Sequence, residues 1–199
     1  MSVSSVRNQL RNQLRESVSV AILEAAEDLI AAKGLQGAPL AQIAKRAGVA
    51  VGTLYNYFAD RDALIRALFE MRRAALRPQL KAAVVKHADL TFEPRLRTFL
   101  HDVFEVFEAH RKFIKVVLEA EHLKKSPATT PQDLAVAIGE LVAVGIAEKK
   151  LDDDLAELLP TVIGGALRAV LVRRIGENRK LSAEDADALV SIVLDGARR

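Results

Sequence analysis

The apolar residues of this chain recur with the period of an α-helix almost throughout. Near the N-terminus, apolar side chains occupy positions i, i+3, i+4 and i+7 of one helical face at Ile22, Ala25, Ala26 and Leu29. No segment shows the alternation of apolar and polar residues that indicates a strand. The chain has 199 residues, of which 50% are hydrophobic, so it is long enough and apolar enough to bury a core. The sequence predicts an all-α protein of about nine helices.

Three helices are expected in the first part of the chain. The first spans Ser17–Lys33 and ends at Gly34, a typical residue just beyond a helix C-terminus. The second is barely two turns long, is opened by Pro39 and is closed by Gly48. The third covers residues 51–57. Two short helices joined by a tight turn that contains glycine, packed on a longer helix, form the layout of a helix-turn-helix unit.

A long fourth helix is expected after Asp60, which can cap it, up to Arg77-Pro78, where proline bends or interrupts a helix. The acidic run Asp152–Asp154 lacks the spacing and the glycine of a calcium loop, so a turn and helix cap are expected there. Further helical patterns cover Glu93–His110, Lys112–Lys124, Pro131–Lys149, Asp154–Asn178 and Ser182–Ala197. The predicted domains are an N-terminal arm or helix extension (1–16), a helix-turn-helix domain (17–63) and a helical domain (64–199).

The expected third helix carries the residue types with which proteins read DNA. Gly52 lets the backbone approach a major groove, Thr53 offers a hydroxyl and a methyl group, and Asn56 can pair with adenine. Tyr55 and Tyr57, the two tyrosines of the chain, present phenolic groups suited to phosphate. The alternative is that these side chains only decorate a surface turn.

Roughly residues 20–64 resemble the DNA-binding domain of TetR/AcrR-type transcriptional regulators. The resemblance is carried, with its spacing intact, by Ile22-Leu23-Glu24-Ala25-Ala26, Ile43-Ala44, Ala47-Gly48-Val49, Gly52-Thr53-Leu54-Tyr55, Tyr57-Phe58 and Asp62-Ala63-Leu64. It implies that the DNA-facing positions are Val51, Gly52, Thr53, Tyr55, Asn56, Tyr57 and Arg61. It also implies that Leu54 and Phe58 hold the unit together. The protein would then bind a near-palindromic operator as a homodimer, with its two recognition helices in successive major grooves.

Two positions depart from the family pattern. Ala38-Pro39 stands where relatives usually open the second helix with threonine or serine, and Ala50 stands where they usually cap the third helix with serine. Loss of an N-cap side chain typically costs about 1 kcal/mol. The recognition helix is therefore expected to be held less firmly before it binds DNA.

The N-terminal segment is basic and repetitive. NQLR occurs twice, at residues 8–11 and 12–15, which places Arg7, Arg11 and Arg15 on one side of any helix they form. The chain has a net charge of +3, and its basic residues exceed its acidic ones only in the N-terminal part. Such an asymmetry fits a polyanionic partner at that end. The segment is a possible DNA arm, or alternatively a frayed terminus that contacts nothing.

The segment Leu155–Gly176 is apolar over most of its circumference, so it must be covered on more than one side. Its Gly164-Gly165 pair would let another helix approach closely. The resemblance implies a dimer through the last two helices, and the alternative is an ordinary core helix of a monomer. The expected interface residues are Leu158, Val162, Gly165, Ala169, Leu189, Ile192 and Val193.

The resemblance further implies that the middle helices enclose a pocket for a small molecule, whose binding shifts the fourth helix and releases the operator. The side chains available for such a pocket are Met71, Phe99, His101, Phe104, Phe107, His110, Phe113 and His122. They are mostly apolar, which predicts a mainly apolar inducer. The pairs His101/Glu105 and Glu119/His122 each lack a third ligand, so neither a metal nor a cofactor is expected.

Other functional classes find little support in the sequence. The absence of cysteine excludes disulfides, thiolate metal sites and cysteine nucleophiles. No common hydrolase, nucleotide-binding or metalloprotease motif occurs. Neither a membrane span nor a secretory signal is readable, so a soluble, cytoplasmic protein is expected. The sequence predicts a ligand-responsive regulator, most simply a repressor. The alternatives are an architectural DNA-binding protein without an inducer and a small helical enzyme.

Overall fold

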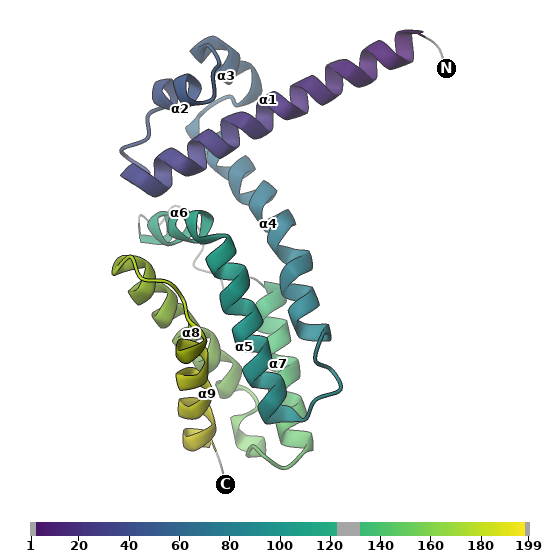
Figure 1. Ribbon diagram of the computed structural model, residues 1–199, viewed down its shortest axis with the longest axis vertical. Coiled ribbons are helices and arrows are strands. Elements are labelled where there is room, and N and C mark those ends of the chain that lie inside the picture. The colour runs from purple at the N-terminus through teal and green to yellow at the C-terminus, as the bar shows by residue number, and fades with distance from the viewer. Residues whose placement is uncertain (1–2, 123–131, 198–199) are drawn as a thin grey trace.

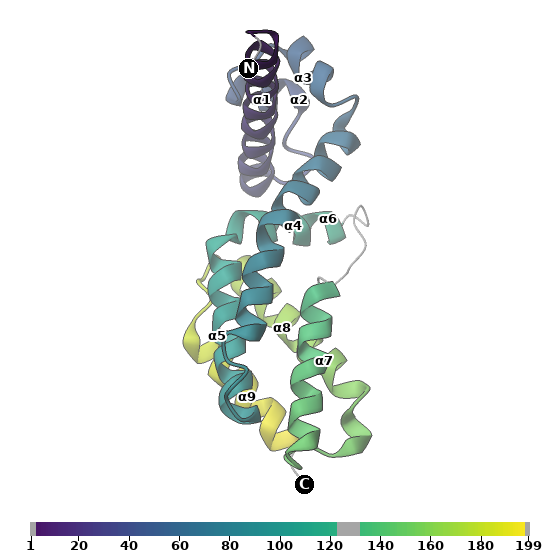
Figure 2. The ribbon, with the colours of Figure 1, turned by 90° about the vertical axis from the view of Figure 1, so that its right-hand side faces the viewer.

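The computed structural model describes residues 3–122 and 132–197, and the regular structure in these residues is helical, as predicted. The helices are α1 (Val3–Lys33), α2 (Leu40–Arg46), α3 (Val51–Tyr57), α4 (Arg61–Val85), α5 (Phe92–Ala109), α6 (Arg111–His122), α7 (Gln132–Ala147), α8 (Leu158–Gly176) and α9 (Ala183–Ala197), with a short 3-10 turn, η1 (Asp153–Leu155), before α8. Figures 1 and 2 show an elongated molecule with α1, α2 and α3 at one end. Helix α4 leads from that end to the bundle formed by α5 to α9.

The N-terminal end is held together by the apolar faces that the sequence predicts. Ile22 of α1, Ile43 of α2, Leu54 of α3 and Leu64 of α4 are all buried, with exposed fractions between 0% and 1%. Helices as short as α2 and α3 are marginal in isolation, so they depend on this packing. Full burial of one such side chain stabilises the folded state by about 1.5–3 kcal/mol.

Helix α1 begins at Val3 rather than at Ser17, so the predicted arm and the predicted first helix form one continuous helix. Neither glycine nor proline occurs between these two positions, and the helical repeat therefore continues without a break. The side chains of residues 5–17 are all exposed. This half of α1 projects away from the rest of the molecule in Figure 1.

Helix α4 continues through Pro78 to Val85, so Arg77-Pro78, where a bend or an interruption was predicted, does not interrupt the helix. Pro78 is exposed, whereas Leu76 and Leu80 on either side of it are buried. The packing of these side chains outweighs the roughly 3 kcal/mol that a proline costs inside a helix. The N-terminus of α4 is as predicted, because the Asp60 carboxylate accepts a hydrogen bond of 2.6 Å from the backbone N–H of Ala63.

The C-terminal end is a helical bundle in which α5 packs against α4, α7 and α9. Helix α8 starts at Leu158, later than predicted, because η1 occupies the preceding residues. The Asp152 carboxylate caps this turn, as expected of the acidic run. Ser182 and Asp185 cap α9 reciprocally. The predicted helix boundaries at Lys124 and Pro131 lie outside the described residues.

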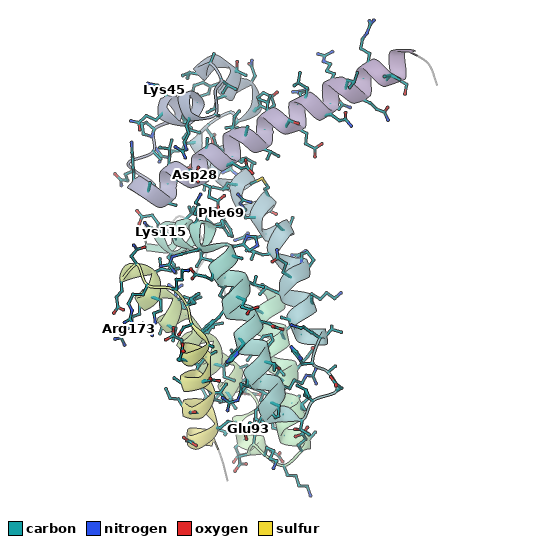
Figure 3. The ribbon with its side chains drawn as sticks, in the orientation of Figure 1. Asp28, Lys45, Phe69, Glu93, Lys115 and Arg173 are labelled. Atoms are coloured by element: carbon teal, nitrogen blue, oxygen red, sulfur yellow. The ribbon has the colours of Figure 1, made fainter. Side chains whose placement is uncertain are left out.

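An ionic junction connects the two ends of the molecule where α1, α2 and α6 meet. Asp28 of α1 accepts hydrogen bonds from Arg46 of α2 at 2.6 Å and from Lys112 of α6 at 2.8 Å. These two bonds, that of Lys112 first, hold the pKa of Asp28 below its ordinary value. Asp28 thus touches both the helix-turn-helix unit and the bundle, and its position is labelled in Figure 3.

Two further contacts reinforce the junction. Glu27 of α1 is only 5% exposed and pairs with Arg72 of α4, whose Nε donates to it at 2.8 Å. The rings of Phe69 on α4 and Phe113 on α6 pack edge to face, with their centroids 5.5 Å apart. A movement of α6 would therefore change its contacts with both α1 and α4.

Candidate nucleic-acid interface

The turn between α2 and α3 has the backbone geometry that a helix-turn-helix unit requires. Gly48 has φ = 72°, a left-handed conformation that favours glycine. The N–H of Val49 donates to the carbonyl of Ala44 at 3.0 Å, which ties the turn to α2. Leu54 and Phe58 are buried on the inner side of α3, as the sequence predicts. The outer side of α3 is consequently left facing solvent.

The predicted DNA-facing residues divide into two groups in the structure. Val51, Gly52, Tyr55 and Asn56 are exposed, and one turn of helix brings their side chains to the same outer face. Thr53 and Tyr57 of α3 are half-buried, as is Arg61, the first residue of α4. Tyr57 packs beside Phe58, with ring centroids 6.4 Å apart, so only part of its ring is available to a partner.

The outer face of α3 is open at Gly52. A Cβ atom placed on this glycine would meet no other atom within 4 Å. Glycine in a helix interior is less favourable than alanine by about 1 kcal/mol, and nothing inside the protein requires it here. The missing side chain leaves room for another molecule to approach the backbone of α3.

Neither short helix has a side-chain N-cap, in agreement with the two departures noted in the sequence. Pro39 is the N-cap residue of α2, one position before the first helical residue, Leu40. Ala50 is the N-cap residue of α3, and no side chain bonds to the N–H groups of its first turn. The position of α3 therefore depends on Leu54 and Phe58 rather than on capping.

Sequence reasoning passed over Lys45, which lies exposed in the last turn of α2 and is labelled in Figure 3. Its neighbour Arg46 is engaged by Asp28. The signal in the sequence was the basic pair at the end of the expected second helix. The sequence alone could not tell which of the two side chains is free to reach a phosphate, because Asp28 is 18 residues away from Arg46.

The structure brings only part of the predicted ligand-pocket set into the interior of the bundle. Phe99, Phe104 and Phe107 of α5 are buried, with exposed fractions between 1% and 3%. Met71 is half-buried against the core. Phe113 is buried as well, but against Phe69 in the junction described above.

The predicted histidines do not join these phenylalanines as a group. His101 is half-buried, and its Nε2 is 3.1 Å from the Asp187 carboxylate of α9, so it is engaged where α5 packs against α9. His110 lies near α4, with its Nε2 2.9 Å from the Gln79 side-chain nitrogen. Burial and then the charge of Arg72 lower the pKa of His110, against the opposing effect of Glu27. The side chain of His122 lies outside the described residues.

The predicted subunit interface also divides into surface and core. On α8, Leu158 is 59% exposed and Val162 is 47% exposed. Further along the same helix, Gly165, Ala169 and Val172 are exposed as well. On α9, Ile192 is 70% exposed. Leu189 and Val193 are instead buried within the chain, so they belong to its core rather than to its surface. The sequence pattern marked an apolar stripe on α9 but not which edge of it the chain itself covers.

The fold is that of a helix-turn-helix unit joined to a bundle of helices, an arrangement found in DNA-binding proteins. The sequence profile of the bacterial regulatory proteins of the tetR family matches residues 22–68. The HTH-type transcriptional regulator YvdT of Bacillus subtilis (strain 168) is 37% identical over 93 residues, which are 47% of this chain and 47% of YvdT. The regulator BetI of Cronobacter sakazakii (strain ATCC BAA-894) is 31% identical over 86 residues, 43% of each chain. The alignments thus span about half the length of these curated relatives.

Solved structures are similar over most of the chain. A TetR-like transcriptional regulator from Rhodococcus sp. RHA1 has a TM-score of 0.71 at 21% identity, over 90% of this chain and 94% of that one. FadR from Bacillus subtilis, solved in complex with stearoyl-CoA, has a TM-score of 0.72 at 18% identity, over 90% and 99%. Residues 22–68 thus match the DNA-binding domain of the tetR family of bacterial regulatory proteins, and the fold over most of the chain is similar to that of TetR-like regulators.

Two other kinds of site, a membrane span and a metal cluster, are not found in the described residues. Within residues 3–122 and 132–197, no helix is both long and apolar enough to cross a membrane. Among the side chains that the structure describes, no three acidic or histidine groups lie close enough together to hold a metal ion.

Proposed function

We propose that the protein is a homodimeric, ligand-responsive repressor that binds a near-palindromic operator and leaves it when a mainly apolar small molecule binds. The observation that carries DNA binding is the outer face of α3, which is exposed, rich in hydrogen-bonding groups and open at Gly52. Such a regulator would act in the cytoplasm, where its operator lies.

Selection of bound duplexes from a random-sequence pool tests this function. We expect one near-palindromic sequence to be enriched, because two identical recognition helices read two half-sites. Indiscriminate binding would favour the architectural alternative, in which the protein has no operator. Failure to retain any duplex at low salt would overturn the proposal.

A side chain at Gly52 should affect folding and DNA binding in opposite directions. Gly52→Ala should stabilise the protein by about 0.5–1 kcal/mol, because alanine is the better helix former and its Cβ meets no protein atom. The same methyl group would stand between α3 and the groove, so the affinity for the selected duplex should fall at least about tenfold, or about 1.4 kcal/mol. Thermal melts and fluorescence-anisotropy titrations measure the two effects.

A matched control is Gly139→Ala on α7, where a Cβ also meets nothing within 4 Å. It should raise stability to a similar extent and leave the affinity for DNA unchanged. If Gly52→Ala bound DNA as tightly as the wild type, the assignment of this face to DNA would be wrong.

Dimerisation is supported by the apolar surface on α8 and α9, defined by Leu158, Val162, Gly165, Ala169, Val172 and Ile192. On α8 these residues recur at intervals of three or four and share one exposed face, and such an apolar face is uncommon on a monomer. A Cβ at Gly165 would meet nothing within 4 Å of the same chain, so the glycine leaves space for a neighbour. A second copy that packs its own α8 and α9 here gives a closed two-fold assembly.

Two negative charges placed on this surface should dissociate the dimer. Val162→Glu with Ile192→Glu should raise the dimer dissociation constant at least about 100-fold, because unpaired charges buried at an interface cost several kcal/mol. Light scattering coupled to gel filtration should report twice the chain mass of 21.7 kDa for the wild type, and a single chain mass for the variant at micromolar concentration. Val85→Glu, at another exposed apolar residue, is the control and should stay dimeric.

The inducer is proposed from the interior of the bundle. The buried phenylalanines of α5 offer an apolar environment, and the structural neighbour FadR was solved with stearoyl-CoA, a molecule with a long apolar chain. Thermal-shift measurements with stearoyl-CoA and with shorter acyl compounds test this class of ligand. A stabilising compound that also releases the selected duplex would qualify as an inducer.

The junction around Asp28 supports a route from ligand to DNA. Lys112 attaches α6 to Asp28, and Asp28 also holds Arg46 next to the helix-turn-helix turn. A ligand that favours a different position of α6 would change this contact and the packing of Phe113 on Phe69. The orientation of α1 and α4, and with it the spacing of the two recognition helices, would follow.

A further inference from the structure

We infer that the unpacked half of α1, residues 5–17, is a second DNA-contacting element that binds backbone phosphates beside the half-site read by α3. This inference rests on the proposed function and names a further surface for the same partner. The surface is the basic stripe formed by Arg7, Arg11 and Arg15, which follow one another at intervals of one helical turn.

The direction of the basic stripe follows from the helical repeat. Arg11 and Arg15 precede the buried Ile22 by 11 and 7 residues, close to three and two whole turns. They therefore point to the same side of α1 as Ile22, which is the side on which the rest of the DNA-binding domain packs. Because α1 is continuous from Val3 to Lys33, this direction is kept beyond the packed half of the helix.

The position of the stripe fits a duplex that lies across α3. Both views place the N-terminal end of α1 and helix α3 at the same end of the molecule, away from the bundle (Figures 1 and 2). Arg7 and Arg15 are separated along the helix axis by about 12 Å, at about 1.5 Å per residue. Since each DNA strand carries a phosphate about every 3.4 Å along the duplex axis, the stripe can follow several phosphates.

The charge of the segment fits DNA as well. Among residues 5–17, Glu16 is the acidic side chain that accompanies the three arginines. In the part of the chain that the structure describes, no carboxylate pairs with Arg7, Arg11 or Arg15. Three guanidinium groups on a projecting helix are thus left for an external anion, and duplex DNA is the polyanion next to this end of the protein.

The apolar residues of the segment make other partners less suitable. Val6, Leu10 and Leu14 are 44%, 61% and 67% exposed. They form a narrow stripe that lies between the basic stripe and the glutamines Gln9 and Gln13, rotated from the direction of Ile22 by about 80° at Leu14 and about 160° at Val6. A membrane-binding helix or a stable helix pair needs a broader or longer apolar face. Three isolated side chains leave the arginines as the main feature of this surface.

The test compares two variants that remove the same charge from opposite sides of α1. Arg11→Gln with Arg15→Gln lowers the net charge by two on the proposed face, and Gln9→Glu with Gln13→Glu does so on the far face. The probe is the duplex that the wild-type protein selects from a random-sequence pool. Its affinity is measured by anisotropy between 50 and 300 mM salt. Each lost phosphate contact should reduce the slope of log K against log[salt] by about 0.9.

We expect the arginine variant to lose about 1.8 units of slope and about 30-fold in affinity at 0.15 M salt, and adding Arg7→Gln should remove about 0.9 units more. The variant Gln9→Glu with Gln13→Glu should keep nearly the slope of the wild type. Amide hydrogen exchange of residues 5–16 should slow when the selected duplex is added to the wild type, because DNA would then order this otherwise unsupported helix.

Three results would overturn the inference. The first is an unchanged slope in the arginine variant, with the wild type still binding its duplex, which would leave the proposed function intact. The second is an equal loss in both variants, which would mean that only net charge matters. The third is loss of binding on replacing Val6, Leu10 and Leu14 with glutamine but not on replacing the arginines, which would assign the segment to another chain or to a lipid surface. A wild type that retains no duplex would instead refute the proposed function itself.

Discussion

Phe58→Ala should lower the free energy of unfolding by about 3–5 kcal/mol, the usual loss when a buried phenylalanine is truncated in a core. Phe58 is 7% exposed and is the C-cap residue of α3, where with Leu54 it packs this helix into the core. Because neither short helix has a side-chain cap, the position of α3 depends mainly on this packing. Chemical denaturation followed by circular dichroism measures the loss.

The control for Phe58→Ala is Tyr57→Phe at the adjacent position. Tyr57 is half-buried beside Phe58, and removing its hydroxyl leaves the packed ring in place. Stability should therefore change by less than about 0.5 kcal/mol, as for other surface substitutions. The affinity for the selected duplex should fall, since a phenol that donates to phosphate is lost. Equal melting curves and equal affinities for the two variants would refute this division between packing and recognition.

Arg72→Met should destabilise the protein by about 3–5 kcal/mol, because it leaves the buried Glu27 carboxylate without its partner. The Glu27 side chain is 6% exposed, and Arg72, at 24%, is the residue of α4 that neutralises it. The loss falls at the contact between α1 and α4. Denaturation at neutral pH and moderate salt measures the effect, which salt should screen little at a buried site.

The double variant Glu27→Met with Arg72→Met separates an ion-pair effect from a packing effect. When both charges are replaced by apolar side chains of similar size, no unpaired carboxylate remains. The double variant should therefore be more stable than Arg72→Met alone by at least about 2 kcal/mol. A double variant that is less stable than the single one would mean that Arg72 acts through its packing and not through Glu27.

The recognition helix was predictable from local patterns because its function depends on local spacing. The order of Gly52, Tyr55 and Asn56 on one face, with Leu54 and Phe58 on the other, follows from the helical repeat once the helix is recognised. The capping of α4 by Asp60 is local in the same sense. The missing caps at Pro39 and Ala50 were equally visible.

The predictions that were wrong depend on contacts between residues far apart in the sequence. His101 was assigned to a pocket without regard to its contact with Asp187 of α9, which lies 86 residues away in the sequence. Proline at position 78 indicated a break, but buried leucines on both sides keep α4 continuous. Leu189 and Val193 were assigned to the surface of α9, but the bundle covers them. Helical periodicity marks an apolar face without telling which neighbour covers it.

The sequence by itself determined that the described residues form helices, that residues 51–57 form a short helix, and that the apolar residues of this helix face inward. These properties follow from the helical repeat, from turn residues and from side-chain chemistry, all of which act within a few turns. Only the tertiary structure decided that Asp28 joins α2 to α6 and that Gly52 and Gly165 face open space. Those properties depend on how the helices pack against one another, which no local pattern specifies.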